Sequence, residues 1–121
     1  MKTDNIIQEK SFAFAIRVVR TYQYLVSEKR EFVLSKQVLK SATSVGANVE
    51  EGIGAQSRAD FISKLSIAYK EARETMFWIK LLKATDYLDP KTAESLLNDA
   101  LEICRIIGKI LITTKNIASR Q

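Results

Sequence analysis

Apolar residues recur every three or four positions along four long stretches of this chain, and this spacing constrains the fold more than any other feature. A period of about 3.6 residues places such side chains on one face of an α-helix. The chain has one proline and four glycines in 121 residues, so few positions interrupt a helix. The pattern predicts helices at about residues 6–27, 36–53, 58–85 and 90–118.

The residues before the predicted helices are suited to capping. Ser35 is the predicted N-cap of the second helix, and Ser57 with Asp60 resembles a capping box at the third. Asp89, followed by Pro90, is the predicted N-cap of the fourth. Connections this short force consecutive helices to pack antiparallel. The sequence therefore predicts an all-α fold, an antiparallel up-down-up-down four-helix bundle, in one domain that includes all 121 residues.

The chain carries more apolar surface than one bundle core requires. A helix of a monomeric bundle needs an apolar stripe about 100° wide, but the polar residues of segment 90–118 fill only a narrow sector. Extended apolar patches usually mark association surfaces, so we predict a homo-oligomer. A core widened by tilted helices is the alternative. The predicted oligomer interface consists of apolar residues outside the main stripes: Phe12, Ile16, Val19, Phe77, Trp78, Leu97, Leu101 and Ile112.

Several classes of catalytic and metal site are excluded by composition. The chain has no histidine, which excludes the usual Ser-His-Asp and Cys-His nucleophilic sites and the Glu-x-x-His pairs of di-iron bundles. Its one cysteine, Cys104, lies on an apolar arc and is predicted to be a core residue. No glycine-rich phosphate loop is present. We predict a protein that is not an enzyme and that binds no metal or cofactor.

Carboxylates cluster near the predicted connection between the second and third helices, at Glu50, Glu51, Glu71 and Glu74. The hairpin brings Glu51 within reach of Lys64, and Lys40 near Glu71 or Glu74. We interpret these as interhelical ion pairs that set the helix register. Acid–base catalysis is the alternative, but it also requires a pocket.

The basic residues suggest a polyanionic partner. The 19 basic and 14 acidic residues give a formal net charge of +5. Lys10, Arg17 and Arg20 share a polar wedge of the first helix with Tyr24, and Arg105 and Lys109 are expected at a matching height on the fourth. This band could hold phosphates and stack a base, so these five basic residues are the predicted nucleic-acid-binding site. The alternative is an ordinary solvated helix face.

The sequence also supports a prediction of the cellular compartment. A single cysteine permits no intramolecular disulfide, which fits a reducing cytoplasm. No signal peptide is visible, and no apolar stretch is long enough to span a bilayer. We expect a cytoplasmic protein without membrane contact.

One stretch of the chain resembles a known family. Residues 40–52 read KSATSVGANVEEG and resemble the signature of the bacterial four-helix-bundle proteins encoded in 23S rRNA intervening sequences. Residues of the third helix, among them Phe61, Leu65 and Trp78, and the Phe12-Ala13-Phe14 run of the first, agree with it. Lys40 departs from the pattern, because the family often has arginine at this position. A lysine keeps the positive charge but cannot make the two parallel hydrogen bonds of an arginine.

The resemblance implies a four-helix bundle and a homo-oligomer, with the homopentamer as the form known among relatives. A related branch, the accessory proteins of diversity-generating retroelements, is basic and binds nucleic acid and a reverse transcriptase. Our hypothesis is a non-enzymatic, homo-oligomeric RNA-associated protein that holds phosphates with the basic band. The alternative is an adaptor or scaffold for a protein such as a reverse transcriptase, without direct RNA contact.

Overall fold

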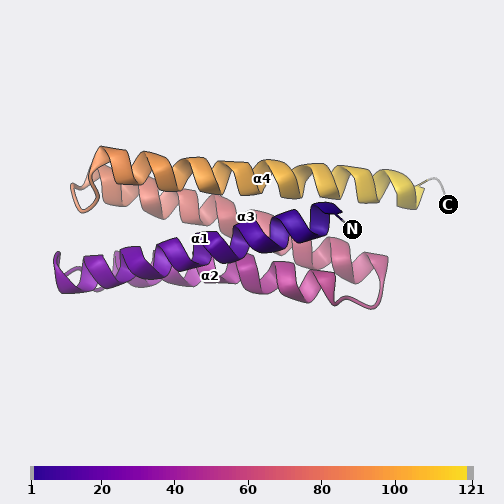
Figure 1. The fold of residues 1–121 in the computed structure, drawn as a ribbon, viewed down its shortest axis with the longest axis horizontal. Helices are drawn as coiled ribbons and strands as arrows, with labels where there is room; N and C mark the ends of the chain where they lie inside the picture. Colours follow the sequence, from indigo (N-terminus) through magenta and orange to yellow (C-terminus); the bar gives the residue numbers. More distant parts are fainter. Residues whose placement is uncertain (1, 120–121) are drawn as a thin grey trace.

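The computed structural model describes residues 2–119 of the chain and the side chains of residues 6–117. The described residues form four helices: α1 (Lys2–Ser27), α2 (Leu34–Ile53), α3 (Arg58–Ala84) and α4 (Pro90–Ser119), as Figure 1 shows. This confirms the predicted all-α class. α1 begins at Lys2 instead of residue 6, and α2 begins at Leu34 instead of residue 36.

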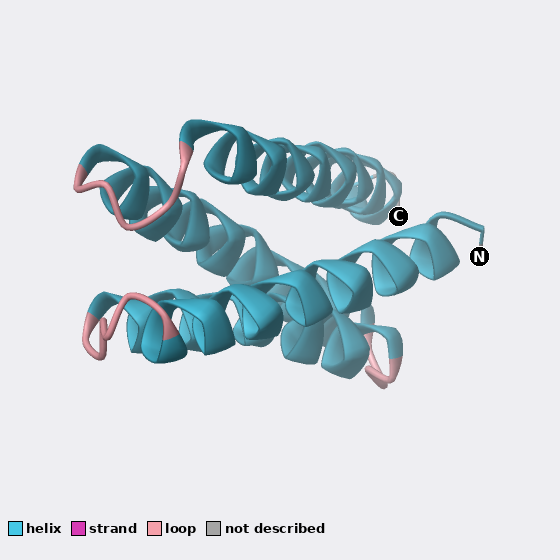
Figure 2. Cartoon of the chain, turned by 60° about the vertical axis from the view of Figure 1, so that its left-hand side comes forward, coloured by secondary structure: helices cyan, strands magenta, loops and turns pink. Residues whose placement is uncertain are grey.

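The helices form a four-helix bundle with the predicted order. Each helix packs against its neighbours in the sequence, and α1 also packs against α4. Figure 2 shows the α1–α2 and α3–α4 loops at one end and the α2–α3 loop at the other. The contact between α1 and α4 is the least extensive, because α1 diverges from α4 toward the end with two loops (Figure 1). The C-terminal end of α4 reaches past the other helices.

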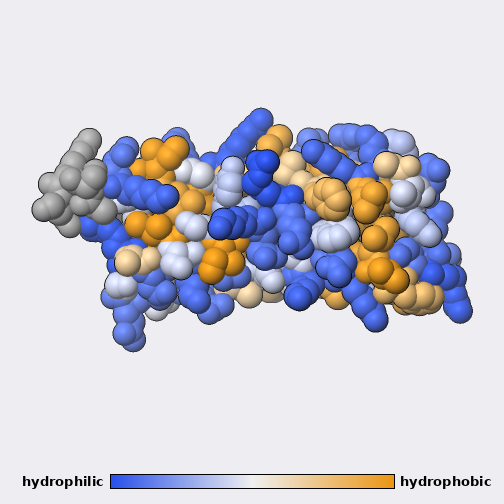
Figure 3. Space-filling model, turned by 180° about the vertical axis from the view of Figure 1, so that it is seen from behind, coloured by the Kyte–Doolittle hydropathy of each residue, from blue (hydrophilic) through white to orange (hydrophobic). Residues whose placement is uncertain are grey.

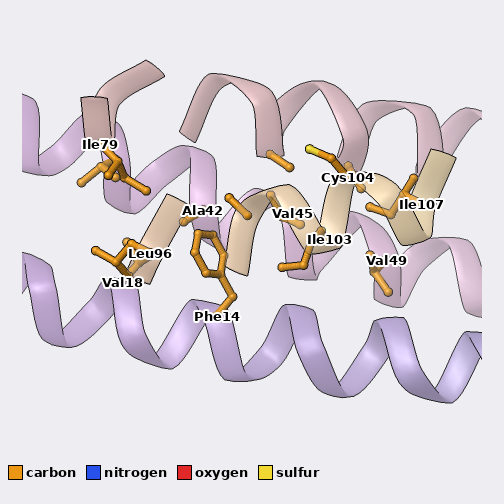
Figure 4. Packing of buried hydrophobic residues seen from close by; sticks show 14 of the residues in the cluster. Phe14, Val18, Ala42, Val45, Val49, Ile79, Leu96, Ile103, Cys104 and Ile107 are labelled. Carbon is orange, nitrogen blue, oxygen red and sulfur yellow. The ribbon is translucent and has the colours of Figure 1, made fainter. Parts of the chain in front are cut away.

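The core is filled by one cluster of apolar side chains from all four helices. The Phe14 ring lies between Leu96 and Ile103 of α4 and points toward Ala42 of α2 (Figure 4). Small residues bring the helices together at Ala42, Ala68, Ala72, Ala93 and Ala100, which are fully buried. Cys104 is buried among them, as predicted.

Two glycines of α2 face neighbouring helices at different distances. A Cβ atom on Gly52 would lie 2.4 Å from Leu65 Cδ2 and 3.3 Å from Lys64 Cβ, so only glycine fits there without movement. A Cβ atom on Gly46 would lie 3.6 Å from the Ser11 carbonyl oxygen, an ordinary contact. The approach of α1 to α2 at Gly46 is therefore not tight, whereas the approach of α3 to α2 at Gly52 is.

The capping prediction for α2 is wrong. Ser35 lies inside the helix, and the N-cap position is Val33, whose side chain makes no capping bond. The cap comes from Glu31 instead, whose carboxylate accepts the backbone N–H groups of Val33 (3.2 Å), Leu34 (3.0 Å) and Ser35 (2.7 Å). Ser35 contributes by donating its hydroxyl to the Glu31 carbonyl oxygen at 2.8 Å.

The other two predicted caps are confirmed. The Ser57 hydroxyl oxygen accepts the Asp60 N–H at 3.1 Å, and Asp89 Oδ2 accepts the Thr92 N–H at 3.0 Å. Both bonds satisfy a backbone donor that has no partner within its own helix. None of the described helices is both long and apolar enough to cross a membrane.

Candidate interaction surfaces

The side of the bundle formed by α1 and α4 carries ion pairs between the two helices. Lys10 Nζ lies 3.0 Å from Glu102 Oε1, and Arg17 Nη1 donates a 2.6 Å hydrogen bond to Asp99 Oδ2. All four side chains are partly exposed, so each pair contributes at most about 1 kcal/mol to stability. The pairs do, however, show which residues of the two helices lie side by side.

This register corrects the predicted basic band. Arg17 lies level with Asp99, and Arg105 lies six residues further along α4, about 9 Å away along the axis. Arg17 is therefore not at the height of Arg105 or Lys109, and the α4 residue beside it is the acidic Asp99. Three of the predicted site residues have no carboxylate oxygen of residues 6–117 within 4.0 Å of their charged groups: Arg20, Arg105 and Lys109.

A second group of exposed cations and rings lies along the last turns of α1, the loop to α2 and the first turn of α2. We call it the basic–aromatic strip. Its rings, Tyr24 and Phe32, are 43% and 47% exposed, and the Arg30 guanidinium carbon lies 5.9 Å from the Phe32 ring centroid. Arg30 has a φ of 54°, a conformation uncommon for a residue with a side chain. The strip consists of Arg20, Tyr24, Lys29, Arg30, Phe32 and Lys36, and the exposed carboxylate of Glu28 interrupts it.

A groove of about 240 Å³ lies on the outside of α1 and α2. Ser11, Gly46 and Ala47 are among its lining residues, and Phe12, which is 67% exposed, lies at its edge. Glu50 also lines this α1–α2 groove and accepts a 2.8 Å hydrogen bond from the Gln8 side chain. Glu9 joins Glu50 in an adjoining depression, so this end of the groove is acidic.

A second groove, of about 570 Å³, lies on the outside of α3 and α4. Its apolar lining includes Tyr69, Gly108 and Ile112, and Ile112 is 64% exposed. Arg105 and Lys109 line it as well, so the α3–α4 groove is basic. Because α1 and α2 form one side of the bundle and α3 and α4 the opposite side, the two grooves face away from each other.

The predicted interface residues differ in exposure, and two of them line these grooves: Phe12 the α1–α2 groove and Ile112 the α3–α4 groove. The exposed ones are Phe12, Ile16, Val19, Phe77, Leu101 and Ile112, whereas Leu97 and Trp78 are half-buried against the core. Trp78 packs edge-on to Phe77 at 5.1 Å and donates its indole N–H to Glu74 at 3.0 Å. Figure 3 shows hydrophobic surface toward both ends of the face seen from behind, with a hydrophilic belt between them.

Cys104 lies in the apolar core and is not an activated thiol. Burial raises the pKa of the Cys104 thiol above its usual value, and the nearby Arg73 only partly opposes this, so the thiol stays protonated at neutral pH. Within residues 6–117, no group of three or more histidine, cysteine, aspartate or glutamate side chains could hold a metal ion.

The carboxylate cluster serves packing between α2 and α3. Lys64 Nζ lies 3.3 Å from Glu51 Oε1, which confirms the predicted pair. Burial raises the pKa of Glu71, the charge of Glu74 adds to this, and Lys40 opposes it, so Lys40 does face this carboxylate. The hydroxyl oxygens of Ser41 and Thr75 meet in a buried hydrogen bond of 2.9 Å between the same helices.

Sequence reasoning missed the acidic partners of the predicted basic site. Asp99 and Glu102 are three residues apart on α4, and Lys10 and Arg17 are seven apart on α1, so each set lies on one helix face. Opposite charges at such spacing on adjacent antiparallel helices are a signal that could have found the pairs. The basic–aromatic strip carried a weaker signal, because the exposure of a loop residue such as Phe32 depends on tertiary packing.

Comparisons with known proteins agree with this architecture. The model of the family described as 23S rRNA-intervening sequence protein matches residues 3–109. A crystal structure of a protein with unknown function, from the S23 ribosomal protein family of Bacteroides thetaiotaomicron, is similar with a TM-score of 0.89 and 50% sequence identity. The alignment covers 90% of this chain and 97% of that one. None of the curated proteins matches significantly.

Proposed function

Because this chain belongs to the family of 23S rRNA-intervening sequence proteins, we propose that it is a non-enzymatic, homo-oligomeric protein that associates with RNA. The similar crystal structure is of a protein with unknown function, so the proposal depends on the surfaces of this chain. Its homo-oligomeric part is supported by the exposed apolar residues beside two opposite grooves, such as Phe12 and Ile112.

The observation that carries the RNA proposal is the alternation of exposed cations and rings in the basic–aromatic strip. Cations that follow a phosphate backbone, with rings that stack on bases, are the usual means of binding single-stranded nucleic acid. Arg17 and Lys10 extend the strip along α1 if phosphates replace Asp99 and Glu102 as their partners. An oligomer repeats the strip, so several weak contacts act together.

Fluorescence anisotropy with a labelled single-stranded RNA of mixed sequence tests this function. We expect affinity to fall steeply as NaCl rises from about 50 to about 200 mM, because phosphate contacts release counterions. Tyr24→Ala and Phe32→Ala should each weaken binding by about ten-fold through lost stacking. Arg20→Gln should lower the salt slope by about one.

The matched control is Lys115→Gln, which removes one exposed positive charge at the far end of α4. It should change affinity less than Arg20→Gln does. Affinity that does not depend on salt, or that is the same in Arg20→Gln and Tyr24→Ala as in the natural chain, would contradict the proposal.

A second candidate is an adaptor that docks a protein such as a reverse transcriptase and makes no RNA contact. The observation that favours it is the pairing of Lys10 and Arg17 with Glu102 and Asp99, which leaves less positive charge on the α1–α4 side for phosphates. An adaptor would assemble normally and show no salt-dependent RNA binding in the same assay.

A further inference from the structure

We infer that the turn at residues 30–32 is a preformed site for one unpaired RNA nucleotide, and that Glu31 is its positioning residue. This inference deepens the proposed function and rests on it, because the turn lies within the basic–aromatic strip. It assigns a phosphate to the Arg30 guanidinium and a base to the Phe32 ring, which is 47% exposed. A base that is free of a duplex can stack on such a ring.

The backbone of Arg30 has a conformation that favours glycine. Its φ of 54° lies in the left-handed region, where an L-residue is less stable because its Cβ approaches the following carbonyl oxygen. A glycine at this position would form the turn without strain, but it would remove the guanidinium. Strained residues of this kind gather at binding sites, where the surrounding structure maintains them. The strain therefore points to a role for the arginine side chain other than forming the turn.

Glu31 fixes the turn through both its side chain and its backbone. It is 8% exposed, and its carboxylate accepts the backbone N–H groups of Val33, Leu34 and Ser35. Its own N–H donates to the Leu25 carbonyl oxygen at 3.0 Å, and its carbonyl oxygen accepts the Ser35 hydroxyl at 2.8 Å. Glu31 is thus bonded to α1 on one side and to α2 on the other. The residues before and after it are held in place by these bonds.

The side chains before and after Glu31 are presented together to solvent. The Arg30 guanidinium carbon lies 5.9 Å from the Phe32 ring centroid, within the range of a cation–π contact. No carboxylate oxygen of residues 6–117 lies within 4.0 Å of this guanidinium. The Glu31 carboxylate already accepts the N–H groups at the start of α2, so the guanidinium is the phosphate-binding group of the turn. A preformed site binds its ligand without the cost of ordering the turn.

A glycine at position 30 separates the stability of the turn from its binding. Arg30→Gly should raise the melting temperature by about 2 to 4 °C, because glycine adopts a positive φ freely. It should weaken binding of a labelled single-stranded oligouridylate by about five-fold, because one phosphate contact is lost. Asp86→Gly is the matched control, because Asp86 has a φ of 67° in the α3–α4 loop at the same end of the bundle. It should be stabilised similarly and should bind the RNA no more weakly than the natural chain.

Two glutamates three residues apart distinguish positioning from charge. Glu31→Ala and Glu28→Ala each remove one negative charge and raise the net charge from +5 to +6, so charge alone predicts tighter RNA binding in both. Because Glu31 positions the turn, Glu31→Ala should instead weaken binding by about five-fold. Glu28→Ala, which removes an exposed carboxylate, should strengthen it. If circular dichroism shows that Glu31→Ala has lost helix, Glu31→Gln takes its place and should weaken binding in the same direction.

The assignment of a base to the ring has its own readout. Phe32→Tyr keeps an aromatic ring and should bind the oligouridylate as the natural chain does. Phe32→Leu keeps an apolar side chain without a ring and should weaken binding by about ten-fold. Equal affinity of the two variants would overturn the assignment of a base to this ring.

The outcomes separate this inference from the proposed function. If Arg30→Gly is more stable than the natural chain and binds the oligouridylate equally well, or if Glu31→Ala binds it more tightly, the nucleotide site at residues 30–32 is wrong. RNA association through Arg20 and Tyr24 then stands. If the natural chain does not bind the oligouridylate at about 50 mM NaCl, where phosphate contacts are strong, both fail.

Discussion

At the residue scale, Glu31 is the ionisable group that caps the start of α2. Burial acts to raise its pKa, but the hydrogen bonds from the backbone N–H groups of Ser35, Leu34 and Val33 outweigh burial and lower the pKa below the ordinary 4.5. A carboxyl with a lowered pKa contributes stability that is present above pH 4.5 and is lost as the pH falls through the folded-state value.

We therefore predict that Glu31→Gln lowers the free energy of unfolding by about 1 kcal/mol at pH 7, because the amide offers one acceptor oxygen instead of two. Urea denaturation at pH 7 and at pH 3 measures this. The difference between the natural chain and the variant should shrink at pH 3, where the natural carboxyl is losing its charge. A difference that is the same at both pH values would contradict the capping role.

Alanine substitutions at Gly46 and Gly52 give a second residue-scale prediction, because they should change the free energy of unfolding in opposite directions. Gly52→Ala should lower the free energy of unfolding by about 1 to 3 kcal/mol, because the alanine Cβ would meet the buried Leu65 side chain. Gly46→Ala should stabilise the isolated bundle by up to about 1 kcal/mol through helix propensity, since its Cβ meets only ordinary contacts. Urea denaturation at one fixed protein concentration compares them. A stabilising Gly52→Ala would contradict the packing described between α2 and α3.

At the scale of the helices, the ion pairs between α1 and α4 determine how much positive charge this side of the bundle offers to RNA. Asp99→Asn with Glu102→Gln raises the net charge from +5 to +7 and frees Arg17 and Lys10. RNA affinity should rise and its salt slope should steepen, while stability falls by less than about 1 kcal/mol for each pair. Glu51→Gln, which frees Lys64 on the α2–α3 side, is the control and should raise affinity less. Unchanged RNA affinity in the double variant would favour the adaptor.

The helices themselves could be predicted because their evidence is local. The apolar period, with Ser57 and Asp89, predicted the starts of α3 and α4 and the ends of all four helices to within one residue of the observed ones. The cap of α2 could not be predicted from local sequence, because it depends on a turn in which Arg30 has a positive φ and Glu31 reaches forward. The relative heights of Arg17 and Arg105 also required the register of α1 on α4, which no local pattern encodes.

At the scale of the whole molecule, the surplus apolar residues could be predicted, but their division between two opposite grooves could not. Helical spacing showed that α4 is apolar on more than one flank, whereas only the packed bundle shows that Ile112 lies with Tyr69 beside α3. The separation of Glu50 from Arg105 on opposite sides likewise follows from the bundle. The account thus depends on a molecule that covers its surplus apolar surface by assembling with further copies of itself.

The mass of the natural chain in solution tests that claim most directly. Sedimentation equilibrium at micromolar concentration should give a discrete multiple of the 13.7 kDa chain, and the mass should persist at moderate salt because apolar contacts carry most of the interface. A single species of 13.7 kDa across the same concentrations would contradict the account, because Phe12, Leu101 and Ile112 would then be exposed on a solitary molecule.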